Sequence, residues 1–336
     1  MRSGSATVKF TLRGQVTVRV GKRTVAEKND VSSDFALALA KTILVGTGST
    51  GAYTSGFALP TSVVIILLYN NAVVATIQAN VSKFSDQMTN VGEDTKVTFV
   101  GSDATPSEYT FNQLELYTAV SQTLYMKVAE VTLPNPVTKN TNDIVEVTWV
   151  EEIISSGSFV AFMNNQLACS NCPSSCNTST LSQYQSKVAV PNLVWALMLV
   201  PGLNKVAQAV SSPMSPYVSQ IYSYYLKNGT VPQILGVTQV VFTDQCLNPI
   251  ATVQVQGEII TYSLTGGEAV VALAMFVTPT QPPYYALPVF SVQGLFSIWL
   301  ALVQVSNPQG LTAGEFSLVV EVPYGSKTLK ALNVNG

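Results

Sequence analysis

The sequence predicts an all-β protein made of two tandem β-sandwich, jelly-roll-like domains, each with a short covering helix. Apolar and polar residues alternate along many short segments, which is typical of half-buried antiparallel strands. Turn-forming residues recur about every 8–12 residues, as they do in sandwiches. The length of 336 residues fits two domains that can each bury a core. A jelly roll is favoured over an immunoglobulin-like sandwich, because the Cys…Trp…Cys spacing of the latter is missing.

The first half contains the clearest strand signals. Val8–Val20 alternates on both sides of Gly14, and we expect it to add to the sheet of a neighbouring molecule. Val63–Leu68 and Ala72–Val81 flank Asn70-Asn71, which predicts a hairpin, because Asn tolerates the positive φ of a tight turn. A serine N-cap and helical apolar spacing predict a helix over about residues 33–44. Further strands are expected at Lys96–Val100, Tyr109–Val120, Thr123–Val131 and Ile144–Ile153.

The second half repeats this order in pattern, which indicates an internal duplication. Val194–Val210 is apolar and helix-like until Pro201, and Gly266-Gly267 separates two alternating segments, as in a hairpin. Residues 155–186 are rich in Ser, Asn, Thr and Cys and lack apolar periodicity, so they are predicted to be a linker or exposed loop. The predicted domains are therefore residues 1–154 and 187–336.

Composition argues against an enzyme. Charged residues make up 11% of the chain, against about 25% in typical domains, so the surface should be polar but nearly uncharged. There is no histidine, which excludes Ser-His-Asp and Cys-His catalysis. Glu151 and Glu152 are adjacent on a predicted strand and should point to opposite faces, so they are poor partners for catalysis. We expect no catalytic residue, cofactor or metal ion.

Nucleic-acid and membrane roles are not expected either. The net charge is -2, and no basic stripe is present. The longest apolar runs, Leu193–Val200 and Ala269–Val277, are shorter than the roughly 20 residues of a membrane-spanning helix. Residues 1–5 lead directly into a strand-like segment without the apolar region of a secretory signal, so we expect none.

Four cysteines are disulfide candidates: Cys169, Cys172, Cys176 and Cys246. An even count in a protein exposed to an oxidising medium favours disulfides, with Cys246 bonded to one of the other three and the remaining two bonded locally. A zinc site and free thiols remain open alternatives. Three sequons make Asn177, Asn228 and Asn80 glycosylation candidates, the first two in predicted loops and Asn80 at the end of a strand.

Two tyrosine groups are interface candidates, because tyrosine combines rigid area with a polar tip. The alternative is that each lies in a loop packed on its own sandwich. The groups are Tyr217, Tyr222, Tyr224 and Tyr225, and Tyr284 with Tyr285.

One resemblance adds to this interpretation. The order of strand, short helix and hairpin is followed by VTFVGSDATPSEYTFNQLELYTA, TLYMKVAEVTL and NDIVEVTWVEEI. Over residues 5–155 this resembles the turret and vertex (penton) capsid proteins of tailless icosahedral archaeal viruses. The resemblance implies stacked jelly rolls at fivefold vertices, a structural role in the virion and a role in host attachment. It implies no catalytic residue.

The leading hypothesis is therefore a virion structural protein at the capsid vertex. Its expected partners are other copies in a closed oligomer, fivefold by the resemblance, together with other capsid proteins and a host surface glycan or receptor. Two alternatives remain. One is a subunit of a cellular extracellular fibre or surface layer, and the other is a carbohydrate-binding module or glycosidase, which would need an aromatic platform or facing carboxylates.

Overall fold

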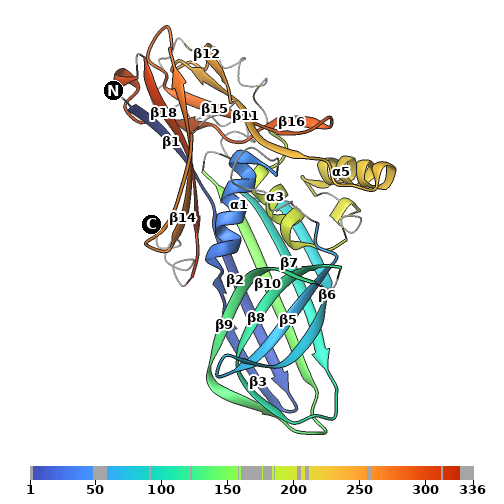
Figure 1. The fold of residues 1–336 in the computed structure, drawn as a ribbon. Coiled ribbons are helices and arrows are strands. Elements are labelled where there is room, and N and C mark those ends of the chain that lie inside the picture. Colours follow the sequence, from blue (N-terminus) through green and yellow to red (C-terminus); the bar gives the residue numbers. More distant parts are fainter. Residues whose placement is uncertain are drawn as a thin grey trace.

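The computed structural model describes residues 3–47, 59–90, 92–121, 123–157, 159, 176, 184, 186–202, 206–208, 212–255, 259–311 and 313–325. These residues form three sheets and a few helices, so the prediction of an all-β, multi-sheet fold is confirmed. Figure 1 shows a long curved sheet at one end, two smaller sheets at the other, and helices between them.

The largest sheet, within the described residues, has nine strands in the order β3-β2-β10-β7-β6-β5-β8-β9-β4. The sheet is strongly curved. β9 lies near one end of the strand order, and it contacts β2 and β3, which lie at the other end. Trp149, Phe99 and Leu116 lie in its fully buried core. The strands are β2 (Thr11–Val20), β3 (Arg23–Lys28), β4 (Asp30–Val31), β5 (Ser62–Tyr69), β6 (Ala72–Met88), β7 (Gly92–Asp103), β8 (Tyr109–Val120), β9 (Thr123–Lys139) and β10 (Val145–Ser156).

The two smaller sheets pack as a sandwich. One has the order β1-β18-β14-β13 and the other β12-β11-β15-β16, with β17 paired to β15. Phe242 of β11 and Phe316 of β18 meet edge to face between them, with ring centroids 4.8 Å apart. Their strands are β1 (Ser3–Lys9), β11 (Ile234–Thr243), β12 (Pro249–Gln254), β13 (Ile259–Thr265), β14 (Glu268–Val277), β15 (Tyr285–Val292), β16 (Phe296–Trp299), β17 (Val303–Gln304) and β18 (Gly314–Pro323), with the 3-10 helix η2 at Pro308–Gly310.

Both predicted hairpin turns are present. Asn70 and Asn71 have φ of 51° and 64° and join β5 to β6, while Gly266 and Gly267 have φ of 63° and 83° and join β13 to β14. In each case residues that tolerate positive φ permit a two-residue turn whose twist matches that of the strands.

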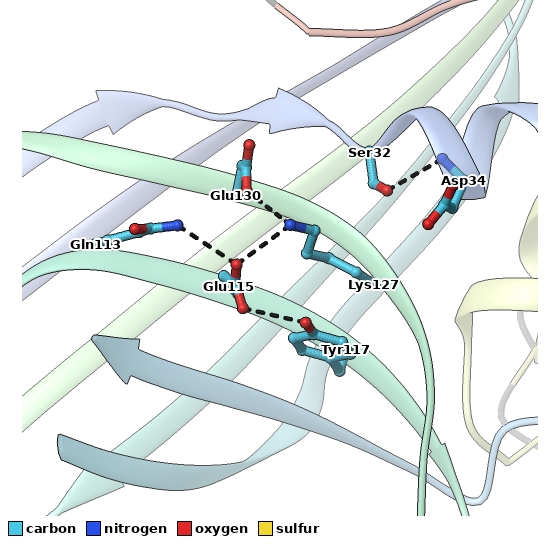
Figure 2. Close-up of polar contacts among 7 residues, drawn as sticks. All are labelled: Ser32, Asp34, Gln113, Glu115, Tyr117, Lys127 and Glu130. Atoms are coloured by element: carbon cyan, nitrogen blue, oxygen red, sulfur yellow. Dashed lines mark hydrogen bonds and ion pairs between the residues drawn. The ribbon is translucent and has the colours of Figure 1, made fainter. Parts of the chain in front are cut away.

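Helix α1 (Ser33–Val45) confirms the helix predicted over residues 33–44. The Ser32 hydroxyl oxygen accepts a hydrogen bond from the Asp34 N–H at 3.2 Å, as an N-cap does (Figure 2). α1 contacts β9 of the large sheet and β11, β14 and β18 of the sandwich. It therefore packs at the junction of the two parts (Figure 1).

The N-terminal region does not follow the predicted domain division. β1 pairs in parallel with β18, with Ser3 opposite Glu315 and Lys9 opposite Glu321. Residues 3–45 therefore contribute to both parts of the molecule, although we predicted 1–154 as one unit. A boundary within residues 155–186 stays a prediction for the rest of the chain. The expected duplication is not visible in the sheets, since one half is a single curved sheet and the other is a sandwich.

Helix α3 (Val190–Leu199) forms part of the apolar segment we expected to be helical. All of its residues are buried, and it ends just before Pro201. Its central position follows from this composition, since a helix that is apolar all round must be covered on every side.

Candidate interaction sites

The first tyrosine group lies on a helix that the sequence analysis missed. We treated Tyr217, Tyr222, Tyr224 and Tyr225 as loop residues, but they belong to α5 (Ser215–Asn228). Pro216 in its first turn and Gly229 at its C-cap, with φ of 69°, are standard helix signals that would have predicted it. The structure therefore corrects this part of the secondary-structure prediction.

The tyrosines of α5 do not form one surface. Tyr217 packs edge to face on Phe296 of β16, with ring centroids 5.0 Å apart, and is half-buried. Tyr225 is exposed, and the neighbouring Leu226 is 65% exposed. Tyr224 lies in a surface groove of about 590 Å³ between α5 and the turn before β16. The groove is lined by Ser219, Gln220, Ser223, Tyr224, Lys227, Asn228, Gly294 and Leu295.

The second tyrosine group lies at the start of β15. The Tyr284 hydroxyl oxygen accepts a hydrogen bond from Gln309 Nε2 at 2.9 Å. Tyr285 packs against a small apolar cluster that includes Leu247 and Leu302. Burial raises the pKa of Tyr285. Tyr285 therefore packs largely within the protein, as the alternative interpretation expected.

One predicted disulfide is present. Cys176 is bonded to Cys246, with Cα atoms 5.1 Å apart and a sequence separation of 70 residues. This confirms that Cys246 bonds to one of the three clustered cysteines. The bond attaches the Cys-rich segment to the turn between β11 and β12. Cys169 and Cys172 lie outside the described residues.

The sequons occupy positions that differ from those predicted. Asn80 lies in the middle of β6, which continues to Met88, so it does not end a strand; it is exposed. Asn228 is the exposed last residue of α5 and not a loop residue, and its amide donates to the Tyr224 carbonyl oxygen at 2.9 Å. Asn177 lies outside the described residues.

A buried polar cluster, which the sequence analysis did not predict, joins the large sheet to α3. The Asn192 amide donates to Thr95 Oγ1 at 2.8 Å and to the Glu93 carbonyl oxygen at 3.0 Å. Its Oδ1 accepts from the Ser155 hydroxyl at 2.5 Å. The Ala189 N–H, just before α3, donates to Glu93 Oε2 at 2.6 Å. These contacts fix the position of α3 against β7 and β10.

The carboxyl groups of this cluster bond to other groups of the chain, except that Glu93 Oε1 is buried without a hydrogen-bond partner among the described residues. Asp86 accepts hydrogen bonds from the Thr95 hydroxyl at 2.6 Å and the Ser212 hydroxyl at 2.7 Å. Burial raises the pKa of Glu93 to about 10, and the nearby charge of Asp86 adds to this rise. Glu93 is therefore protonated at neutral pH. The scattered sequence positions of these residues gave no signal of the cluster.

Glu151 and Glu152 have the separate surroundings that their adjacency predicts. Glu151 Oε1 accepts from Trp149 Nε1 at 2.7 Å and from Asn29 Nδ2 at 2.6 Å. Burial raises the pKa of Glu151 to about 8. Glu152 instead forms ion pairs with Arg13 and with Lys96, the latter at 2.7 Å. Each carboxyl group therefore has its own structural partners.

A third group of carboxylates crosses the other end of the large sheet. Glu115, Glu130 and Asp30 lie opposite one another on β8, β9 and β4. Figure 2 shows Lys127 between two of them, with Nζ 3.2 Å from Glu115 and 2.8 Å from Glu130. Desolvation lowers the pKa of Lys127, but these two carboxylates outweigh it and raise that pKa. Tyr117 also donates to Glu115, so the charges of Glu115 and Glu130 are compensated within the protein. Burial and the charge of Glu130 raise the pKa of Asp30.

The predicted strand-donating segment is not free. β2 lies between β3 and β10, so both of its edges are paired. β1 pairs with β18, and on its other side the Ser5 carbonyl oxygen accepts from the Ser306 N–H at 2.8 Å. For Thr11–Val20 the prediction that this segment adds to a neighbour's sheet is wrong, because this chain pairs β2 with β10 on one side and, over Gln15–Val20, with β3 on the other. Val8 and Lys9 lie on the edge strand β1, and for them it stays a prediction.

The similar proteins are viral. Over 328 residues the chain is 27% identical to "Uncharacterized protein 53" of Sulfolobus islandicus filamentous virus (isolate Iceland/Hveragerdi), covering 96% of this chain and 95% of that protein. Over 172 residues it is 28% identical to "Putative transmembrane protein ORF289" of Acidianus filamentous virus 2 (isolate Italy/Pozzuoli), covering 49% and 53%. A viral origin is supported.

Other comparisons add no family or fold relative, since no protein-family model and no solved structure matches. Both viral relatives come from filamentous viruses, so they give no support to the predicted resemblance to turret proteins of icosahedral viruses. Within the described part of the chain, no helix has both the length and the apolar character needed to cross a membrane.

Proposed function

We propose that this protein is a non-enzymatic structural component of a virion, acting through protein–protein interfaces. Similarity along 96% of the chain to a protein of a filamentous virus supports a viral role for the whole molecule. The low charge and the apolar surface then support a role in assembly.

The observation that carries the proposal is the number of large apolar side chains on a surface with little charge. Exposed large apolar side chains are candidates for contacts with other proteins, and few charges here oppose close contact between copies. Val73, Leu226 and Phe276 are 60%, 65% and 62% exposed. The other exposed members are Tyr69, Met88, Val100, Leu124, Tyr125, Ile144, Tyr225, Tyr262 and Leu264.

The carboxyl groups support the non-enzymatic part of the proposal. Glu93, Glu151 and Glu152 are buried and bonded to other groups of the chain. A pair of carboxyl groups that performs hydrolysis needs access to substrate and water. Within the described residues, the buried carboxyl groups instead connect structural elements.

The proposed location in the virion is based on the relatives from filamentous viruses and not on the resemblance to turret proteins. Filaments arise from head-to-tail interfaces that do not close into a ring, whereas a penton needs fivefold closure. We therefore propose a virion location with copies of itself and other capsid proteins as partners, and we do not assign a fivefold vertex. A cellular fibre or surface layer is the alternative that the viral relatives disfavour.

Immunogold electron microscopy of intact virions tests this role. Antibodies against the folded protein should label the particles of the virus that encodes it, and competition with purified protein should abolish the labelling. Labelling restricted to host membranes or to debris from lysed cells would contradict a role in the virion.

A second candidate function is glycan binding in the groove beside α5. The groove combines one aromatic ring, Tyr224, with the amides of Gln220 and Asn228 and the Lys227 ammonium group. Aromatic rings with adjacent hydrogen-bonding groups suit sugars. A glycan array would test it: Tyr224→Ala should abolish binding that the exposed Tyr125→Ala variant retains. Absence of binding by the unmodified protein would reject this candidate.

A further inference from the structure

One sequon, Asn228-Gly229-Thr230, lies at the exposed end of a helix. Asn228 is the last residue of α5, and residues 229–233 after it belong to no helix or strand. Residues 225–230 are all exposed. Gly229 has a φ of 69°, and a methyl group built on it would meet no atom of the described chain within 4 Å. An enzyme can therefore approach the sequon without obstruction from these residues.

The Asn228 side chain can be released from the helix at little cost. Its Nδ2 donates a hydrogen bond to the Tyr224 carbonyl oxygen at 2.9 Å, and this bond is exposed to solvent. Water can replace such a bond with little change in free energy. The end of a helix also opens more easily than its centre, because its last carbonyl groups have no partner within the helix. The Asn228 amide can therefore enter an active site while the rest of the protein stays folded.

The other described sequon, Asn80-Val81-Ser82, is held within a sheet. Val81 packs against the hydrophobic core and lies opposite Phe99 of β7. The Ser82 hydroxyl donates to the Thr98 carbonyl oxygen at 3.2 Å. An enzyme that surrounds this sequon would have to break these contacts. The Asn80 side chain is exposed, but its sequon is therefore a poor acceptor.

We propose that Asn228 is N-glycosylated in the infected cell and that Asn80 is not. In this reaction the Asn228 amide nitrogen forms a bond to the anomeric carbon of a lipid-linked oligosaccharide. The bond from that carbon to the phosphate oxygen of the lipid breaks, and the lipid phosphate leaves with the electron pair. One amide proton is lost to a base of the transferring enzyme. The Thr230 hydroxyl completes the sequon that such enzymes recognise.

A glycan at this position would change the surroundings of the end of α5. Tyr225 and Leu226, directly before Asn228 and Lys227, are 42% and 65% exposed. A glycan is bulky and polar, so it keeps other surfaces away from the side chains beside it. Contacts between copies would then use exposed apolar side chains elsewhere. The modification does not depend on the proposed role in the virion, and it is separate from the binding of another molecule's glycan in the groove.

Peptide mass spectrometry of the protein purified from infected cells tests the proposal. The peptide that contains Asn228 should carry a mass excess of whole sugar residues, and the peptide that contains Asn80 should carry none. Variants are produced from a plasmid in the same host. N228Q should remove the mass excess, and T230A should also remove it although Asn228 is unchanged. T230S keeps the hydroxyl group and should retain the mass excess.

The matched control is N80Q, which changes the exposed asparagine of the other described sequon. It should leave the mass excess unchanged. An Asn228 peptide without sugar, a mass excess that T230A retains, or a glycan on Asn80 would overturn the proposal. Labelling of virions is measured separately, so failure here leaves the structural role to its own test.

Discussion

Replacing Glu151 by Gln should remove part of the pH dependence of stability. Glu151 is buried against Trp149 and Asn29, and its pKa rises from 4.5 to about 8. The folded state therefore holds a proton that the unfolded state releases above pH 4.5. This contribution is fully present below pH 4.5 and is lost as pH rises toward 8.

The size of the effect follows from the shift. Each unit of pKa difference corresponds to about 1.36 kcal/mol, so Glu151 should lower the free energy of unfolding by about 3 kcal/mol between pH 4.5 and 7. With about 2.1 cal/mol/K of unfolding entropy per residue over 336 residues, this corresponds to about 4 °C in Tm. Gln keeps an acceptor for Trp149 and Asn29 but does not titrate. The pKa of Glu93 is also raised, so this group likewise makes the free energy of unfolding fall as pH rises.

Thermal melts at half-unit steps from pH 4 to 8 provide the assay. The Glu151→Gln variant should gain stability relative to the unmodified protein as pH rises, while Glu146→Gln, an exposed substitution on the same strand, should not. If the Tm of Glu151→Gln changes with pH as that of the unmodified protein does, the buried carboxyl group of Glu151 is not the cause of the pH dependence of stability.

Three further changes test other parts of the structure. C176S/C246S, which removes the Cys176–Cys246 bond, should lower the free energy of unfolding by about 4.4 kcal/mol, because the bond closes a loop with a sequence separation of 70 residues. Urea denaturation measures this difference, and equal stability of the two proteins would contradict it. Asn192→Ala should lower the free energy of unfolding by about 3 kcal/mol, because it leaves buried polar groups unpaired. In the same assay, Asn228→Ala, at an exposed position, should leave stability nearly unchanged. Gly14→Ala should lower the free energy of unfolding by about 1–3 kcal/mol, because a methyl group there collides with the Asn29 side chain. An unchanged thermal melt would contradict this and would mean that Asn29 moves aside without loss of stability.

The local features of the fold could be predicted because their signals are local. The Ser32 cap, the Asn70-Asn71 turn and the glycine turn at 266–267 depend on backbone preferences of the residues themselves. Helix α5 had the same kind of signal in Pro216 and Gly229, and the cluster of tyrosines, which are weak helix formers, obscured it.

The long-range contacts could not be predicted in this way. β1 pairs with β18 across more than 300 residues, and alternation alone does not select a partner strand. The buried cluster around Asn192 draws on β7, β10 and α3, whose proximity is a consequence of packing.

Quantitative mass spectrometry of density-purified virions tests the central claim most directly. A structural component should co-purify with the particles in many copies each, in constant ratio to the other virion proteins through successive gradients, and should survive mild protease treatment that removes adsorbed host proteins. A protein that stays in the infected-cell fraction, or whose ratio to virion proteins falls with each gradient, would contradict the claim.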